Sequence, residues 1–320
     1  LGIRWLNALL GVACVVLTWL TGEYVLSRRA GLFSAAVVAV GAPFLVTSRF
    51  VYTNTITLFL LLLNLLAFWW MASDQAGIVE GLLFGLTLAL LFNTKYSAYV
   101  YAAAIGAVLL LDHRHLLSTP RLWLATGVGA LGLIPVLVWN AQNGWVSLRW
   151  QFSHLTGATV QETSLLGSAH HTWVYLTGPL VLLAAAGLGR VRNPAERLLT
   201  VVALFLLIPV GLSPINSPRN LTTGLVPLLL LAGARLPPQL TTQLQRAGAG
   251  ILASLLLTTA LFGAGTVVNL AKPSPFPHSS IVTAIRRDAA GLPALGAALQ
   301  QESDPIFALD YSLAAQIRYY

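Results

Sequence analysis

A single lysine, Lys95, lies between two apolar stretches in the segment FNTKYSA, and no other lysine precedes residue 272. A lysine at the centre of a bilayer costs about 2.5–3.5 kcal/mol on insertion scales, and less near the interface. One interpretation is an interfacial lysine whose ammonium group reaches the lipid headgroups. The other is a cation that binds a phosphate at the membrane surface, where an ion pair is little screened. The nearby Tyr96, Tyr99 and Tyr101 fit an interfacial aromatic belt or the wall of a binding site.

A second group of polar and aromatic residues lies in the segment IPVLVWNAQNGWVSLRWQFSHLTG, residues 134–157. If residues 145–155 form a helix, Trp145 and Arg149 share one face, as do Trp150 and His154. Such a pattern fits an amphipathic helix lying on the bilayer surface. It also fits a carbohydrate site, because flat rings stack on sugar faces and amides bond to sugar hydroxyls. The candidate substrate-pocket residues are Tyr96, Asn140, Trp145, Arg149, Gln151 and His154.

The segment SPINSPRN, residues 213–220, contributes a further cation, Arg219. Lys95 and Arg219 together are a candidate anion-binding site, where a phosphate could bind. His154 is the one candidate metal ligand in the segment 134–157. The prediction of a divalent metal site therefore depends on a single side chain. The sequence contains no GxxxxGK[ST], HExxH or paired-cysteine motif. Its one cysteine, Cys14, excludes an internal disulfide.

The composition sets the class of protein. Of the 320 residues, 57% are hydrophobic and 9% are charged, whereas a soluble domain carries about 25% charged residues. Too few charges remain to cover a water-facing globule, so we predict an all-α polytopic membrane protein surrounded by membrane lipids. The formal net charge is +8. No basic stretch is interleaved with exposed aromatic residues, so nucleic acid is not a predicted partner.

Apolar runs predict about ten transmembrane helices. Residues 31–48 and 53–71 could also be divided differently around Pro43. The predicted spans are 5–26, 31–48, 53–71, 78–93, 96–111, 121–139, 173–189, 198–212, 221–235 and 248–269.

Lysine and arginine are enriched in cytoplasmic loops, which predicts the orientation. One set of loops holds Arg28, Arg29, Arg114, Arg121, Arg190, Arg192, Arg197, Arg235 and Arg246. The opposite set, up to residue 270, holds Arg4, Arg49, Lys95, Arg149 and Arg219. The first set has more positive charges and is predicted to be cytoplasmic. The Lys95 turn and the long loop 140–172 are then extracytoplasmic.

Two domains are predicted. Residues 1–270 would form the transmembrane domain, and residues 271–320 would begin a small extracytoplasmic domain. The more polar tail contains a linker, PSPFPH, then a helix broken at Pro293, a strand DPIFALD and the start of a helix in YSLAAQIRYY. This βα order predicts the start of a small α/β domain. Because Leu1 is not methionine and the chain stops without a helix cap, we expect a fragment that lacks residues at both ends.

Several segments in order resemble a known family: RWLNALLG, APFLVTSRFVYTNTITLFLLLLNL, LTLALLFNTKYSA, IPVLVWNAQNGWVSLRWQFSH and IFALDYSLAAQIRYY. Together they are similar to the bacterial family 39-type glycosyltransferases. These resemble protein mannosyltransferases and the lipid A aminoarabinose transferase, all of the GT-C class. The resemblance covers nearly the whole chain, and NTKYSA with WNAQNGWVS is its most specific part.

The resemblance implies an enzyme of the bacterial inner membrane whose active site is extracytoplasmic. It would move a hexose or pentose from a polyprenyl-phosphate donor to a lipid, glycan or protein acceptor. Lys95 matches the family's lysine near the donor phosphate, and His154 matches a loop histidine that binds metal or acceptor in some relatives. The family's catalytic aspartate lies in the first outer loop, which we expect upstream of Leu1. Asn54 stands where many relatives have an aspartate.

Two functions other than glycosyl transfer are also compatible with the sequence. A transporter or flippase for a lipid-linked or anionic solute would use Lys95 and Arg219 as transit sites. No acidic residue lies deep in a predicted span, and the sequence shows no repeat of one half in the other. Both absences weaken the transporter interpretation. A flippase moves its substrate unchanged, whereas a transferase releases polyprenyl phosphate. A membrane scaffold would need Lys95 for stability alone.

Overall fold

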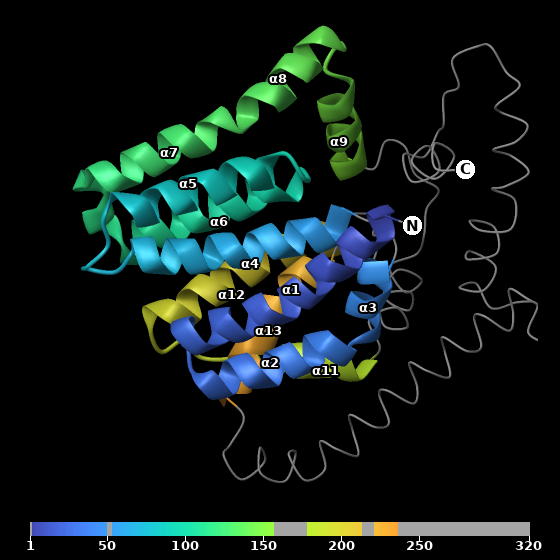
Figure 1. The fold of residues 1–320 in the computed structure, drawn as a ribbon, viewed down its shortest axis with the longest axis vertical. Coiled ribbons are helices and arrows are strands. Elements are labelled where there is room, and N and C mark those ends of the chain that lie inside the picture. Colours follow the sequence, from blue (N-terminus) through green and yellow to red (C-terminus); the bar gives the residue numbers. More distant parts are fainter. Residues whose placement is uncertain (1, 50–52, 157–177, 213–220, 236–320) are drawn as a thin grey trace, which may run out of the picture. The chain divides into compact units, whose positions relative to one another are not determined.

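The computed structural model describes residues 2–49, 53–156, 178–212 and 221–235, and within these ranges it contains helices and turns but no strand. The all-α class predicted from composition is confirmed. The tail strand, the span 248–269 and the boundary at residue 270 lie outside the described residues. The helices are α1 (Gly2–Val25), α2 (Arg28–Val40), α3 (Ala42–Arg49), α4 (Thr53–Met71), α5 (Ile78–Phe92), α6 (Ser97–Asp112), η1 (Arg114–Ser118), α7 (Pro120–Leu131), α8 (Leu133–Gln142), α9 (Val146–Thr156), α11 (Gly178–Ala185), α12 (Pro194–Leu212) and α13 (Thr222–Arg235) (Figure 1).

Three of the described helical segments are long and apolar enough to cross a membrane: 6–25, 53–71 and 120–142. The prediction of one span over 53–71 coincides with α4. The predicted span 31–48 is instead two helices, because Gly41 is extended (φ −65°, ψ 121°) between α2 and α3. Pro43, which lacks an N–H group, then falls in the first turn of α3, where no donor is needed. The count of ten spans remains a prediction.

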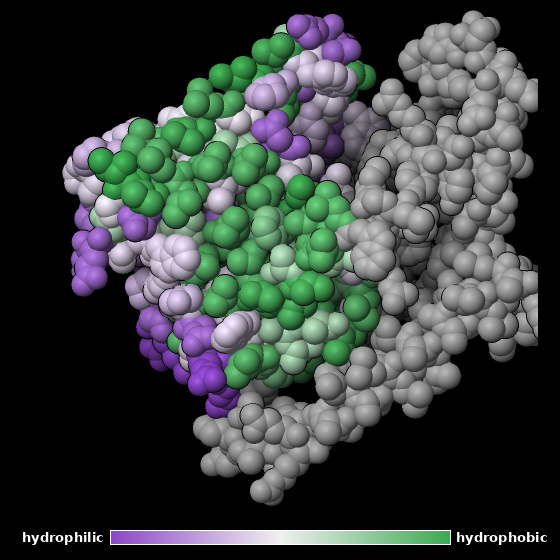
Figure 2. Space-filling view, in the orientation of Figure 1, coloured by the Kyte–Doolittle hydropathy of each residue, from purple (hydrophilic) through white to green (hydrophobic). Residues whose placement is uncertain are grey.

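Helix α4 lies at the centre of the packed core. Helices α1 and α5 pack against it, α7 packs on the far side of α5, and α12 packs against α6 and α13. Along α4, Leu62, Leu65, Phe68 and Met71 are completely buried. Helices α5, α7 and α8 instead expose rows of large apolar side chains, which appear as an apolar face in Figure 2. An apolar outer face is the expected surface of a bundle in lipid.

A buried polar network fixes α4, α5 and α6 against one another. The Asn64 amide group donates to the carbonyl oxygen of Phe84 at 2.8 Å and to Thr87 Oγ1 at 2.7 Å. The hydroxyl of Tyr101 donates to Asn64 Oδ1 at 2.8 Å. Unpaired polar groups are costly in hydrocarbon, so this network allows few alternative registers of the three helices. Their register determines where the turn between α5 and α6 lies.

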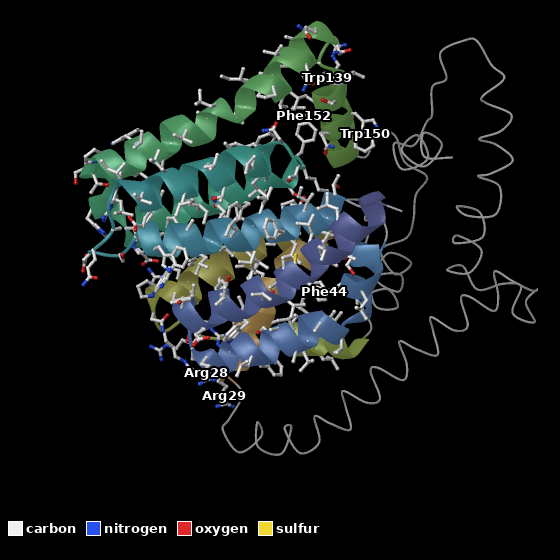
Figure 3. The ribbon with its side chains drawn as sticks, viewed as in Figure 1. Arg28, Arg29, Phe44, Trp139, Trp150 and Phe152 are labelled. Carbon is white, nitrogen blue, oxygen red and sulfur yellow. The ribbon has the colours of Figure 1, made fainter. Side chains whose placement is uncertain are left out.

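Ion pairs join the helix ends that carry the predicted cytoplasmic loops. Arg197, at the start of α12, pairs with Asp112 at the end of α6. Arg235, at the end of α13, pairs with Glu196 at 3.0 Å. Arg28 begins α2 near the end of α13 (Figure 3). These contacts show that arginines grouped from the sequence gather at one end of the bundle, while the side of the membrane stays a prediction.

Close backbone approach joins α5 to α7 through glycine. A Cβ atom built on Gly85 would lie 2.5 Å from the carbonyl oxygen of Ala125, and one on Gly132 would lie 2.4 Å from the Cα atom of Ala89. Real Cβ atoms do not come so near, so both positions require glycine unless the helices separate. Gly127, also on α7, is different, because a Cβ atom built there would meet no other atom within 4 Å. This contact brings the α7–α8 span alongside the helices that carry Lys95.

We expect Gly85→Ala to destabilise the protein by about 1–3 kcal/mol, because the added methyl group overpacks the α5–α7 contact. The matched variant Gly127→Ala has room for its methyl group and gains helix propensity, so we expect it to be neutral or stabilising by up to about 1 kcal/mol. Equilibrium unfolding in detergent micelles measures both. Equal stability changes in the two variants would contradict the close contact between α5 and α7.

Candidate functional site

Lys95 lies in the short turn between α5 and α6. The amide of Thr94 donates to the carbonyl oxygen of Leu91 at 3.0 Å, and the Lys95 carbonyl oxygen accepts from the amide of Ala98 at the start of α6. Lys95 Nζ donates to Asn54 Oδ1 at 3.0 Å, across to the first turn of α4. An amide oxygen has no net charge, so this contact orients the ammonium group without neutralising it. The turn therefore presents a cation from a partly buried, oriented side chain.

A band of polar residues lies at the same end of α1, α3 and α4. The Asn7 amide group donates to the carbonyl oxygens of Thr47 and Ser48, each at 2.9 Å. Thr55 Oγ1 donates to the Thr47 carbonyl oxygen at 2.8 Å. These bonds anchor the end of α3 and the first turn of α4, and thus the position of Asn54 beside Lys95.

An apolar groove of about 320 Å³ opens beside the Lys95 turn. Its walls come from α1, α4 and α5, and its polar margin is formed by Asn93 and Thr94, the two residues before Lys95. The lining residues are Leu10, Ile56, Phe59, Leu60, Leu90, Asn93 and Thr94. Lys95 is the next residue in the chain after this lining. An apolar groove and a cation on adjoining residues match the two halves of an amphiphile, a hydrocarbon tail and an anionic headgroup.

Tyr96 joins the same turn to the connection between α8 and α9. Its hydroxyl forms a short hydrogen bond with Ser147 Oγ. Ser147 Oγ donates to Asn140 Oδ1 at 2.6 Å, and Asn140 Nδ2 approaches the Tyr96 hydroxyl at 3.4 Å. Asn140 is only 1% exposed. Of the predicted pocket residues, Tyr96 and Asn140 are therefore brought together, and in this structure they bond to each other and to Ser147.

The connection between α8 and α9 contains two consecutive residues in the left-handed region. Gly144 has φ 63° and Trp145 has φ 60°. A bulky residue rarely adopts positive φ, which costs about 1–2 kcal/mol outside glycine. The Trp145 amide donates to the Asn140 carbonyl oxygen at 2.7 Å, which helps to hold this conformation. The helix expected over 145–155 thus begins at Val146, and Trp145 precedes it.

Helix α9 carries further predicted pocket residues. Arg149 is exposed and Gln151 is partly buried. Trp150 is 47% exposed and Phe152 66% exposed, and both project from α9 (Figure 3). The His154 side chain and Arg219 lie outside the described residues, so their roles remain predictions. Within the described ranges, no three His, Cys, Asp or Glu side chains are grouped to hold a metal ion.

Comparison with known proteins identifies the fold. Residues 1–139 match a family model described as dolichyl-phosphate-mannose-protein mannosyltransferase. The crystal structure of ArnT from Cupriavidus metallidurans bound to undecaprenyl phosphate matches 99% of this chain and 70% of its own, with TM-score 0.61 and 14% identity. The apo structure of that protein matches 99% of this chain and 59% of its own, with TM-score 0.54 and 16% identity. No curated protein sequence gives a significant match.

These matches define the class. The chain has the GT-C fold of ArnT, and its residues 1–139 are similar to the protein mannosyltransferases, which agrees with the resemblance recognised in its sequence motifs. At 14–16% identity, the solved structures show the shared fold alone.

Sequence reasoning missed two residues at the site. It identified Asn54 as a departure from the family pattern but not as the partner of Lys95, 41 residues away. It did not single out Ser147, which bonds both Tyr96 and Asn140. Nothing in the sequence around Ser147 indicates a contact with Tyr96, which lies 51 residues away along the chain.

We expect Trp145→Gly to be more stable than Trp145→Ala by about 1 kcal/mol, because only glycine adopts φ near 60° without strain. Both substitutions remove the indole ring, so their difference isolates the backbone conformation. Unfolding midpoints and slopes of the two variants provide the measurement. If alanine were the more stable of the two, as at an ordinary helical position, the left-handed conformation would be refuted.

Proposed function

We propose that this protein is a membrane glycosyltransferase that moves a sugar from a polyprenyl-phosphate donor to an extracytoplasmic acceptor. The observation that carries the proposal is the turn in which Lys95 directly follows Asn93 and Thr94, two residues that line the apolar groove, with the Lys95 ammonium group oriented by Asn54. The match of residues 1–139 to a mannosyltransferase family named for a lipid-phosphate sugar supports the reaction class. The undecaprenyl phosphate bound to the similar ArnT supports the donor class.

In the proposed reaction, the acceptor attacks the anomeric carbon and polyprenyl phosphate leaves. The Lys95 ammonium group, together with Arg219, would offset the negative charge that develops on the leaving phosphate. The donor tail would lie in the groove lined by Leu10, Ile56 and Leu90. Trp145, with the α9 residues, would face the sugar or the acceptor.

The acceptor must also lose a proton to a base. All five acidic residues in the described ranges lie toward the helix ends opposite Lys95; these are Glu23, Asp74, Glu80, Asp112 and Glu196. The proposed carboxylate base therefore belongs to a part of the protein outside those ranges. No step is assigned to a metal, for which His154 is the single candidate ligand.

We expect Lys95→Ala to lower the release of free polyprenyl phosphate by about 10- to 100-fold, the loss typical of a charge-assisted contact. Lys95→Arg keeps the charge and should lose much less, although its fork-shaped geometry differs. The measurement uses the complete protein in liposomes with polyprenyl-phosphate sugars and candidate acceptors.

Equal release by the wild type, Lys95→Ala and Lys95→Arg would refute the phosphate role. Movement of intact lipid-linked substrate between leaflets without release would identify a flippase instead. Gly127→Ala, which alters neither the groove nor the Lys95 turn, serves as the matched control for expression and reconstitution.

The proposed extracytoplasmic face is tested by labelling. Lys95 and Lys272 are the only two lysines in the chain, so a membrane-impermeant amine reagent has few targets. We expect the reagent to label Lys95 from outside intact cells or right-side-out vesicles. Ser73→Lys places a lysine at an exposed position in the loop between α4 and α5, and this lysine should react only after permeabilisation. The reverse pattern would contradict the proposed orientation.

A further inference from the structure

Within the described ranges, helices α8 and α9 form an arm that packs little against the rest of the bundle. Among the described elements, α9 packs chiefly against α8, and α8 chiefly against α7. Large apolar side chains along α8, including Leu137 and Val138, are about half exposed. In Figure 1 the arm bends at the α8–α9 connection, so that α9 returns toward the side of the bundle where α4 begins. Among the described residues, specific hydrogen bonds rather than broad packing join α9 to the rest of the bundle.

The contacts that do so come from the four-residue turn that contains Lys95. Asn93 Nδ2 donates to the Gly132 carbonyl oxygen at 2.9 Å, where α7 meets α8. Tyr96 bonds to Ser147, in the first turn of α9. The same turn therefore contacts both ends of α8. Of its two other side chains, Thr94 donates to the Leu91 carbonyl oxygen and Lys95 is the proposed phosphate ligand.

The hydrogen bonds among Tyr96, Ser147 and Asn140 have one consistent direction. Asn140 Nδ2 donates to the Val136 carbonyl oxygen at 2.9 Å, which fixes the orientation of the amide group. Asn140 Oδ1 can then only accept, so the single hydroxyl hydrogen of Ser147 is used in that bond. The Tyr96 hydroxyl must therefore donate to Ser147 Oγ. It accepts in turn from Asn140 Nδ2, which closes a ring of three side chains.

We propose that this ring, which we call the clasp, is a positioning device that holds α9 beside Lys95. The clasp rests on the proposed function for its role in turnover, and it assigns Tyr96, Ser147 and Asn140 to positioning rather than to contact with substrate. It acts on the α9 residues that would meet the sugar or acceptor, such as Arg149. The strained backbone at Trp145 makes the clasp necessary, because the left-handed turn needs support from its neighbours.

Hydrogen exchange of the α9 amides tests the clasp without any need for turnover. We expect Tyr96→Phe to raise exchange across residues 146–156 by about 2- to 10-fold, the range for loss of one neutral hydrogen bond. Ser147→Ala should also raise the exchange of these amides. Alanine has the higher helix propensity, so a change in propensity alone would instead lower the exchange. The double variant should exceed either single variant only slightly, because both remove the same contact.

Two controls accompany this measurement. Tyr99→Phe removes a phenol hydroxyl in the first turn of α6, from a residue whose ring contacts the rings of Phe92 and Tyr96. Because the ring stays, this variant should leave α9 exchange unchanged. Exchange of α13 reports whether each variant is folded. Unchanged α9 exchange in Tyr96→Phe, or fully additive effects of the two single variants, would overturn the clasp.

The role in turnover is separated from donor binding by two further measurements. Loss of the clasp should lower kcat/KM by about 2- to 10-fold while the Kd for polyprenyl phosphate alone stays within twofold, since Lys95 is intact. An equal loss in Kd would make these residues donor ligands and overturn the positioning role. Wild-type protein without release activity would refute the proposed function, and the exchange experiment would still decide whether the clasp exists.

Discussion

The lack of water in the bilayer core is the constraint on which this structure depends. A polar group without a partner there costs several kcal/mol, so every buried side-chain amide must be fully bonded. Asn64 meets this requirement with partners on α5 and α6. Among the described residues, ionised groups lie near helix ends, in connecting turns or on the short helix α9; Arg235 pairs with Glu196 at one end of the bundle and Lys95 contacts Asn54 at the other. Chemistry on a charged substrate is thereby restricted to helix ends and their connecting turns.

The turn between α5 and α6 shows how such an end becomes a site. Its residues contact α4 through Lys95, the α7–α8 junction through Asn93, and α9 through Tyr96. A functional side chain on a turn is held precisely only if neighbouring elements support it. Here the support comes from helices that the buried network of Asn64 has already placed in register. The site and the fold therefore depend on the same contacts.

The sequence predicted what local patterns determine. Apolar length located α4 over 53–71, and the charge pattern grouped the arginines that gather at one end. The sequence did not predict contacts between distant residues, because nothing in the segment around Lys95 identifies Asn54 as its partner. The left-handed conformation of Trp145 was also missed, since tryptophan ordinarily avoids positive φ. Family motifs drew attention to the right segments, but only the folded chain brings Tyr96 to Ser147.

The central claim is that Lys95 binds the phosphate of a lipid donor at the end of an apolar groove. Its most direct test is the Kd of polyprenyl phosphate, without sugar, for the protein in nanodiscs. The account predicts that Lys95→Ala weakens binding at least about tenfold, the effect of losing a charge-assisted contact, while Lys95→Arg binds more tightly than Lys95→Ala. Equal Kd values for the wild type and Lys95→Ala would contradict the claim.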